Sequence, residues 1–245
     1  MRSVTVIPAR MASTRFPGKP LADLAGKPMV QWVWERAVEA ACAERVVIAT
    51  PDVDIAEAAR QFGAEVAMTR MDHPSGTDRI AEVAESYPAD FYINVQGDEP
   101  LVPIETICGL ARAMEDGTPM ASVWCPCREE EISNPAVVKV VSDLQGNALY
   151  FSRHAIPYPR TSDPEPPKKH IGLYAYRREV VQAFAGWPMS PLERTESLEQ
   201  LRFLENGVRI RMVRGEASPV AVDTPEQAVE ATILLTNLSV IKAAP

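Results

Sequence analysis

The first loop of the chain gathers cations that no acidic residue of the same segment neutralises. The segment VIPARMASTRFPGKP, residues 6–20, starts in an apolar run that stops at Pro8 and continues with Arg10, Arg15 and Lys19 among small residues. Guanidinium and ammonium groups beside accessible backbone N–H groups are suited to binding several phosphate oxygens at once. The alternative is a solvated loop whose charges face water. The spacing matches neither GxxxxGK[ST] nor GxGxxG, which excludes those two classes of phosphate loop.

Two carboxylates stand where they could bind a divalent cation. Asp98 follows an apolar run in INVQGDEP, beside Gly97, and Asp223 lies in VAVDTPE. Mg²⁺ prefers hard oxygen ligands and usually takes one or two protein carboxylates together with substrate phosphates. Each carboxylate also has a structural alternative. The Gly-Asp pair forms an ordinary turn, and Asp223 or Thr224 caps the helix that follows.

A third polar segment, DHPSGTDR at residues 72–79, lies between a predicted strand and a predicted helix. Hydroxyl and backbone groups of Ser75, Gly76 and Thr77 could bind a base or a ribose. His73 could act as a general base, although a loop histidine beside proline is more often a positioning or surface residue.

The elements that must position these segments follow from the pattern of apolar residues. In the first half, β-rich runs at 3–8, 45–50, 65–68 and 91–96 alternate with helical patterns at 29–40, 54–63, 79–87 and 104–115. Asp52 is expected to cap the second of these helices, and Thr77 or Asp78 the third. Such alternation predicts an α/β fold with a doubly wound parallel sheet and helices on both faces. Ligands of open α/β sheets bind at the carboxyl ends of strands.

Near residue 119 the pattern becomes β-rich. Strands are expected within 120–126, 136–143 and 147–153, with a hairpin turn at 142–147 and an exposed Pro-rich loop at 160–169. A strand and helix over 170–184, a capped helix over 190–207, a strand over 208–214 and a last helix that begins near Pro225 should follow. We expect one domain over residues 1–245, with a small β-rich insertion at about 120–175 that supplies a second ligand's pocket.

Composition limits the classes of function. The chain has 25 Lys and Arg against 33 Asp and Glu, a formal net charge of −8, which argues against general binding to nucleic acid or anionic membranes. The four cysteines, Cys42, Cys108, Cys125 and Cys127, are few and irregularly spaced, which is typical of a reducing compartment. Cys-Pro-Cys without a second ligand pair favours small buried residues over a metal site. No apolar stretch approaches the roughly 18 residues of a membrane helix, and no signal peptide is evident, so we expect a cytoplasmic protein.

Eight segments, in order from residue 4 to about residue 230, resemble the 3-deoxy-manno-octulosonate (Kdo) cytidylyltransferase family, the CMP-Kdo synthetases of lipopolysaccharide assembly. They are IPARMASTRFPGKPL, MTRMDHPSGTDRIAE, NVQGDEPLVP, NPAVVKVV, ALYFSRHAIP, HIGLYAYRR, LEQLRFLENG and VDTPE. The first segment also resembles related cytidylyltransferases such as CMP-sialate synthetases, whereas the combination is specific. The resemblance implies a Rossmann-like doubly wound mixed sheet of the nucleotide-diphospho-sugar transferase type.

The resemblance also implies the reaction and its residues. CTP and Kdo would give CMP-Kdo and pyrophosphate, with the sugar's anomeric 2-hydroxyl attacking the α-phosphorus. The implied catalytic residues are Arg10, Lys19 and Asp98, and the implied Mg²⁺ ligands are Asp98 and Asp223. The implied CTP site is Ala9, Arg10, Arg15, Lys19, Ser75 and Gly76, and the implied Kdo site is Gln96, Arg153, His170, Tyr174, Glu199 and Gln200.

Several alternatives stay open at the level of sequence. The sugar acid could be 8-amino-Kdo or a sialic acid, although Glu99 in QGDEP resembles the Kdo form. A catalytically silent nucleotide-binding protein on the same fold is a different class, and the presence of both carboxylates and all three loop cations argues against it. A P-loop phosphotransferase would need the absent Walker motif. The family implies a homodimer, for which the segment around Trp124 and Tyr150 is the candidate interface.

Overall fold

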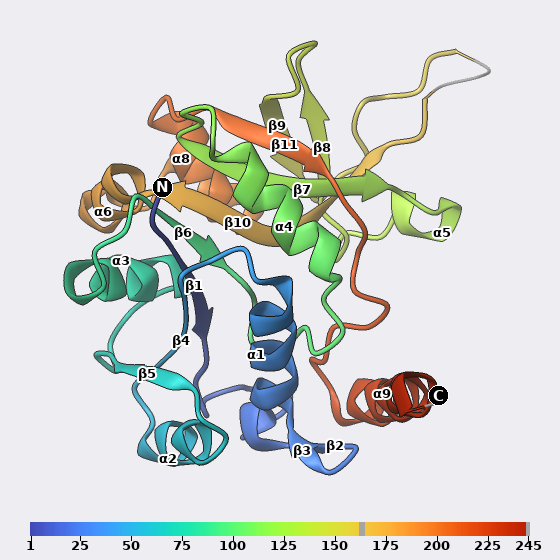
Figure 1. Ribbon diagram of the computed structural model, residues 1–245. Helices are drawn as coiled ribbons and strands as arrows, with labels where there is room; N and C mark the ends of the chain where they lie inside the picture. Colours follow the sequence, from blue (N-terminus) through green and yellow to red (C-terminus); the bar gives the residue numbers. More distant parts are fainter. Residues whose placement is uncertain (162–164, 244–245) are drawn as a thin grey trace.

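The computed structural model describes residues 1–161 and 165–243 and shows an α/β fold around one mixed sheet (Figure 1). The Pro-rich segment predicted to be an exposed loop lies partly outside these residues. The first half contains β1 (Ser3–Pro8), a 3-10 turn (Lys19–Leu21), β2 (Asp23–Leu24), β3 (Lys27–Pro28), α1 (Met29–Ala40), β4 (Arg45–Thr50), α2 (Val53–Gln61), β5 (Glu65–Met68), α3 (Gly76–Ser86), β6 (Phe91–Asn94) and α4 (Ile104–Ala113).

The second half is richer in strand, as the sequence predicts. It contains β7 (Met120–Pro126), α5 (Glu129–Ile132), β8 (Lys139–Ser142), β9 (Ala148–Ser152), β10 (Lys168–Arg177), α6 (Arg178–Gly186), α7 (Pro191–Glu196), α8 (Gln200–Glu205), β11 (Ile210–Arg214) and α9 (Pro225–Ala243).

The main path of the sheet has the order β11-β7-β10-β6-β1-β4-β5. All neighbours on this path are parallel except β10, which runs antiparallel to both β6 and β7. The expectation of a parallel sheet is therefore correct for the first half of the chain. Across the whole chain the sheet is mixed, as the resemblance implies.

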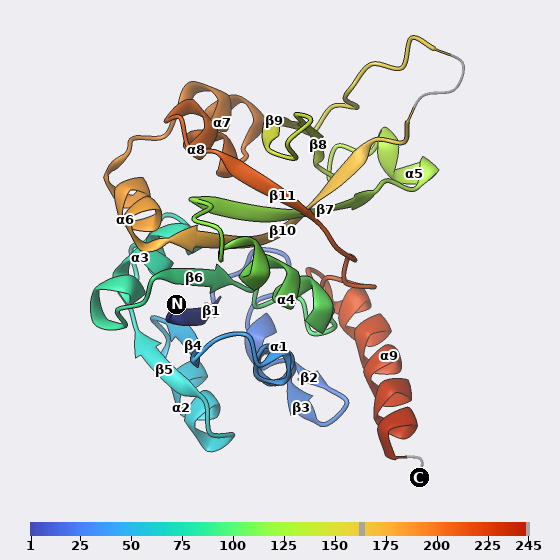
Figure 2. The same cartoon turned by 45° about the horizontal axis from the view of Figure 1, so that its top comes forward.

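The segment at 120–175 is continuous with the main sheet, because β7 and β10 are inner strands of it. Only β8 and β9 branch from the main path, and their hairpin projects from the body of the molecule (Figures 1 and 2). The predicted turn between them forms as expected: the Asp143 carboxylate accepts hydrogen bonds from the backbone N–H and side-chain amide of Asn147, at 2.7 and 3.1 Å.

Three local predictions need correction. The cap of α3 is Ser75, whose hydroxyl accepts the N–H of Asp78 at 3.2 Å, so neither Thr77 nor Asp78 is the cap. Asp52 precedes α2 but its carboxylate accepts the N–H of Met11, at 2.8 Å, and thereby fixes the first loop. The helix predicted over 190–207 is two helices, α7 and α8, because Ser197 between them adopts a left-handed conformation with φ 52°.

Helices cover both faces of the sheet, each by an apolar stripe. Residues of α1, α2 and α4 pack on one face, and residues of α3, α6 and α8 on the other. The last helix, α9, packs apart from both layers, on the β2–β3 hairpin, through Leu24, Val222, Ala231 and Leu235. This packing brings the segment before α9 back to the first loop of the chain. Within the described residues, no helix combines the length and apolar character that crossing a bilayer requires.

Candidate active site

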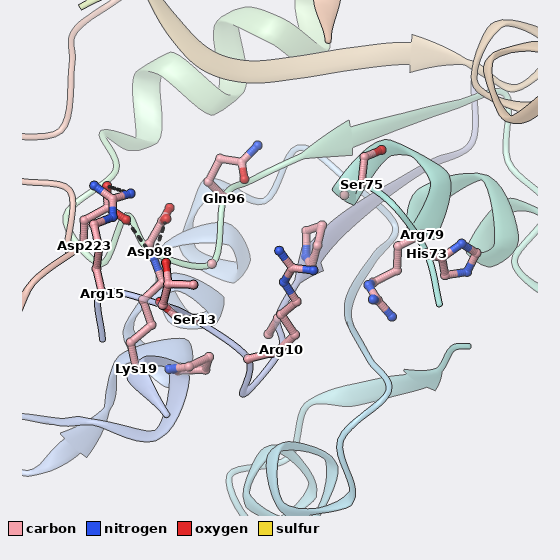
Figure 3. A pocket seen from close by; sticks show the side chains of 17 residues that line it. Arg10, Ser13, Arg15, Lys19, His73, Ser75, Arg79, Gln96, Asp98 and Asp223 are labelled. Carbon is pink, nitrogen blue, oxygen red and sulfur yellow. Dashed lines mark hydrogen bonds and ion pairs between the residues drawn. The ribbon is translucent and has the colours of Figure 1, made fainter. Parts of the chain in front are cut away.

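A cavity of about 680 Å³ opens at the carboxyl ends of β1 and β6. The three polar segments singled out in the sequence meet around it, together with the turn before α9 (Figure 3). Its lining consists of Pro8, Ala9, Arg10, Ala12, Ser13, Thr14, Arg15, Lys19, Pro20, His73, Ser75, Gly76, Arg79, Gln96, Gly97, Asp98 and Asp223. Every residue predicted for the nucleotide and for the metal therefore borders one cavity.

The ammonium of Lys19 joins the two carboxylates that the sequence places far apart. Its Nζ lies 2.8 Å from Oδ2 of Asp98 and 3.0 Å from Oδ1 of Asp223, and it also donates to the carbonyl of Val222 at 3.2 Å. A guanidinium nitrogen of Arg15 lies 2.9 Å from the other oxygen of Asp223 (Figure 3). Two loops thus converge on one positive charge.

Backbone contacts hold this convergence. A Cβ on Gly97 would lie 2.6 Å from the carbonyl oxygen of Pro8, so only glycine lets the loop after β6 pass so close to the end of β1. One residue further on, the carbonyl of Asp98 accepts the N–H of Val222 at 2.8 Å. These two contacts fix Asp98 against both the first loop and the segment before α9.

Asp223 is not the cap of the last helix. The hydroxyl of Thr224 accepts the N–H of Gln227 at 3.4 Å, and the Gln227 side chain in return accepts the N–H groups of Asp223 and Thr224. This reciprocal arrangement satisfies the start of α9 without the Asp223 carboxylate. That carboxylate is consequently free to face the cavity.

The charges around Lys19 keep it protonated. Burial opposes the charge of the ammonium, but Asp98 and Asp223 outweigh burial, so the pKa of Lys19 is raised. Glu99 carries less than a full negative charge at neutral pH, because burial, assisted by the charge of Asp98, raises its pKa to about 7. The two facing carboxylates therefore carry most of the negative charge at this end of the cavity.

The same carboxylates fit a divalent cation. They already converge on one cation, and two protein carboxylates are the number that Mg²⁺ commonly takes. In the described part of the chain, no group of three or more His, Cys, Asp or Glu side chains could hold a metal. A cation here would thus need further oxygens from a bound ligand.

Arg79 was missed in the sequence. It is 3% exposed, and its guanidinium donates to the hydroxyl of Thr69 and, at 3.1 Å, to the carbonyl of Arg70. Burial lowers its pKa, and the neighbouring charge of Arg10 lowers it further. Two like charges facing one cavity are stabilised by an anion between them. The available signal was the position of Arg79 in SGTDR, one turn into α3 beside the polar segment.

His73 lies on the same wall and is buried. Its Nε2 forms a short hydrogen bond with the Glu82 carboxylate, which also accepts the N–H of Arg70 at 3.0 Å. Burial opposes the charge of Glu82, but these hydrogen bonds outweigh burial and lower the pKa of Glu82. This pairing favours a positioning role for His73 over that of a general base.

A second cavity of about 160 Å³ adjoins the first and shares Gly76 and Gln96 with it. Its lining consists of Gly76, Thr77, Asn94, Gln96, Gly172, Tyr174, Tyr176, Glu199, Gln200 and Phe203. Four of the six residues predicted for the sugar acid belong to it: Gln96, Tyr174, Glu199 and Gln200. Asn94 and Tyr176 were not predicted, because they lie in strand patterns that indicate core, and Thr77 was considered only for a base or a ribose.

A chain of hydrogen bonds orients the polar wall of this cavity. The hydroxyl of Ser122 donates to the carbonyl of Leu173 at 2.9 Å, so it must accept from Nε2 of His170, 2.8 Å away. The Nδ1 of His170 then accepts from the Gln200 amide at 3.4 Å, and Gln200 accepts from the hydroxyl of Tyr174 at 3.4 Å. His170 thus lies behind the cavity and positions Gln200.

Glu199 connects the two cavities. The hydroxyl of Ser75, on the wall of the first cavity, lies 3.1 Å from Oε2 of Glu199 and 2.7 Å from Oδ2 of Asp78. One hydroxyl proton cannot serve both carboxylates at once. Burial raises the pKa of Glu199, and the charge of Asp78 adds to this effect. A proton on Glu199 relieves the conflict.

Arg153, like His170, borders neither cavity, in contrast to the other four residues predicted for the sugar acid. Its guanidinium donates to the carbonyls of Glu196, Ser197 and Pro135 at 2.7, 3.2 and 3.1 Å. Backbone carbonyls therefore take the place of the carboxylate that it was expected to bind. In this arrangement Arg153 fixes the left-handed turn between α7 and α8, which carries Glu199.

The comparisons with known proteins agree with one another. A family model described as cytidylyltransferase matches residues 4–210. The chain is similar to the 3-deoxy-manno-octulosonate cytidylyltransferases of Syntrophotalea carbinolica (49% identity over 97% of this chain and 100% of that protein) and Pseudomonas fluorescens (52% over 90% and 93%). It is also similar to a solved CMP:2-keto-3-deoxy-manno-octonic acid synthetase complexed with CTP, at 43% identity and a TM-score of 0.94, over 97% of this chain and 99% of that one.

The buried imidazole of His170 yields a prediction about pH. Burial lowers its pKa from 6.5 to about 3. Below pH 6.5 the unfolded chain binds a proton that the folded protein does not, so stability is lost as pH falls from 6.5 toward 3. Between pH 7 and pH 5, this imidazole should lower the free energy of unfolding by about 2 kcal/mol, as measured by urea unfolding.

The control is a histidine without such burial. His170→Gln should flatten this part of the pH profile, whereas the exposed His154→Gln should leave it unchanged. An identical slope in wild type and His170→Gln would contradict a neutral buried imidazole.

Proposed function

The chain belongs to the cytidylyltransferase family, and we propose that it transfers the cytidylyl group of CTP to Kdo, with release of pyrophosphate. The observation that carries this proposal is the pair of joined cavities. One gathers four cations and two carboxylates at the carboxyl edge of the sheet, and the other offers hydroxyl, amide and carboxyl groups suited to a polyhydroxy acid. A sugar-acid nucleotidyltransferase needs both, side by side.

The larger cavity would hold the triphosphate. Arg10, Arg15 and Lys19 supply positive charge from the first loop, and Arg79 supplies it from the opposite wall. Backbone groups of Ala9 and Gly76 and the hydroxyl of Ser75 complete the proposed nucleotide site. Fixed cations of this kind stabilise the charge that develops on the departing pyrophosphate, which is the main requirement of phosphoryl transfer.

The sugar acid would occupy the smaller cavity with its anomeric hydroxyl toward the shared boundary at Gly76 and Gln96. A bond forms between that oxygen and the α-phosphorus while the bond from the α-phosphorus to the bridging oxygen of the β-phosphate breaks. The electron pair of the broken bond leaves with pyrophosphate, and the proton of the attacking hydroxyl is released to water. The described lining of the smaller cavity contains no Lys or Arg. The carboxylate of Kdo should therefore also face the boundary, within the field of the first cavity's cations.

Asp98 and Asp223 are the proposed Mg²⁺ ligands. When bound there, the ion would supply Lewis-acid stabilisation of phosphate charge. The protein positions both carboxylates itself. The close approach of Gly97 to the carbonyl of Pro8, and the hydrogen bond from the N–H of Val222 to the carbonyl of Asp98, hold them in place. Once another cation neutralises the two carboxylates, Lys19 is released to bind phosphate oxygens.

The setting of the enzyme is a further part of the proposal. We propose a cytoplasmic homodimer whose product serves lipopolysaccharide assembly, as the family resemblance implies. The β8–β9 hairpin supports an interface in this region, because its residues Leu144 and Leu149 are exposed to solvent, with exposed fractions of 102% and 62%. Trp124 and Tyr150 are half-buried; Lys168 lies over the Trp124 ring and the Tyr150 hydroxyl faces Glu196 at 3.4 Å.

Light scattering at micromolar concentration should give about twice the chain mass of 26.9 kDa. Leu149→Glu, which places a charge on the exposed apolar face, should lower the measured mass toward that of one chain. A monomeric wild type would rule out the dimer.

The reaction itself is tested by pyrophosphate release with CTP, Mg²⁺ and a panel of acceptors: Kdo, 8-amino-Kdo and N-acetylneuraminate. Kdo should give the highest kcat/KM, with a phosphodiester signal in the ³¹P spectrum that accounts for the pyrophosphate released. Arg10→Ala should lower the rate with every acceptor, because it removes charge from the nucleotide cavity. Absence of release with all three acceptors would favour the silent nucleotide-binding alternative.

Asp223→Asn tests the metal role. It should lower turnover roughly 100-fold or more while the fold stays intact, since an amide removes one of only two charged ligands. The matched control is Thr224→Ala, which removes the actual helix cap and should cost about 0.5–2 kcal/mol of stability but keep turnover. An Asp223→Asn enzyme with wild-type turnover and Mg²⁺ dependence would show that the carboxylate only pairs with Lys19.

A further inference from the structure

A third cavity, of about 90 Å³, lies at the opposite edge of the sheet from the candidate active site. Its lining includes Asp116 and Thr118, just before β7, and Arg209 and Arg211, at the start of β11. Both β6 and β7 run antiparallel to β10, so β7 is parallel to β6. The beginnings of β7 and β11 therefore lie at the edge away from the ends of β1 and β6, and this cavity is separate from the two described above.

Two guanidinium groups of this cavity form no ion pair within the described residues. In the described ranges, neither Arg209 nor Arg211 has a carboxylate within 4.0 Å of its side-chain nitrogens. The Nε of Arg211 is buried and has no hydrogen-bond partner. A buried unsatisfied donor on a charged group is costly, so a partner for it is expected.

The nearby carboxylate does not supply that partner. One oxygen of Asp116 accepts both the N–H and the hydroxyl of Thr118, at 3.1 and 2.6 Å, within its own turn. These hydrogen bonds lower the pKa of Asp116, so the carboxylate is charged at neutral pH. The cavity thus has two cations against one anion that is already engaged.

The frame around the guanidinium groups is fixed. Asn147, in the β8–β9 turn, forms a backbone bridge with Arg211, and the carbonyl of Gly146 accepts the N–H of Met212 at 2.8 Å. The side-chain amide of Asn147 is held by Asp143. The hairpin therefore closes one side of the cavity beside Arg211, which is half-buried, whereas Arg209 on the other side is exposed.

We propose that this cavity binds one tetrahedral oxyanion, a phosphate ion or the terminal group of a phosphate monoester, between Arg209 and Arg211. Guanidinium forks match such oxygens in geometry as well as charge, and an oxygen of the anion would satisfy the free Nε of Arg211. The size suits a single such group but not a nucleotide. The site is independent of the proposed reaction, since it shares no residue with the two cavities that would perform it.

The test is a titration of the full-length protein with inorganic phosphate, at constant ionic strength and with excess CTP and EDTA present to fill the larger cavity. The backbone amide signals of Gly117 and Thr118 in ¹H–¹⁵N spectra report on the site. We expect a saturable shift of both signals. Arg211→Gln and Arg209→Ala should each weaken binding roughly tenfold or more. Arg214→Ala, on the same strand but outside the cavity, should not.

Two further arms sharpen the result. Asp116→Asn should strengthen phosphate binding, because it removes the only opposing charge of the lining while an amide oxygen can still accept from Thr118. Ribose 5-phosphate is titrated in parallel with inorganic phosphate. Tighter binding of inorganic phosphate would identify a free ion as the ligand, and tighter binding of ribose 5-phosphate would identify a phosphate monoester. The proposal is overturned if the shifts do not saturate, or if they persist unchanged in both arginine variants. If Arg211→Gln unfolds the protein, phosphate binding by Arg209→Ala tests the proposal instead.

Discussion

The geometry of the candidate active site depends on one half-buried ammonium group. Lys19 holds Asp98 and Asp223 together, although they follow different elements 125 positions apart in the chain. Without that charge, two carboxylates brought so near would repel each other and push the loop after β6 away from the segment before α9. The close passage of Gly97 over Pro8 leaves this loop little freedom to move. The cavity is therefore shaped by the same contacts that prepare it for a cation and a polyanion.

Local patterning predicted the first half of the fold closely. The bounds expected for β1, α1, β4 and β5 agree with the structure. The strands β1 and β4 are short, almost continuous buried runs, and α1 buries residues at a helical period, so local apolar patterning is enough to predict them. The break at Ser197 was not predicted. It depends on carbonyl contacts with Arg153, from a strand more than 40 residues earlier, and no local pattern encodes such a contact.

In the candidate active site, too, local sequence predicted some features and distant contacts decided others. The residue types of the first loop indicated phosphate chemistry, and the motifs gathered by the resemblance do line one pair of cavities, with Arg153 outside and His170 behind. Arg79 was missed because its one signal was its position in SGTDR beside the polar segment, and its burial cannot be read from that position. Whether a charge faces a cavity or a set of carbonyls is decided by packing around it, which is why the roles of Arg79 and Arg153 differ from what their sequence contexts suggested.

The position of β10 has a consequence for how the chain is assembled. This strand lies between β6 and β7, yet it follows both in the sequence. During synthesis, the edge of β6 that faces β10 stays unpaired until residue 177 has left the ribosome. Before then, β7 has no strand through which it can join the main sheet. Gly172, Tyr174 and Tyr176 arrive on that same strand. The insertion of β10 thus joins β6 to β7 and brings these residues to the second cavity in the same step, and Glu199, Gln200 and Phe203 complete the cavity later.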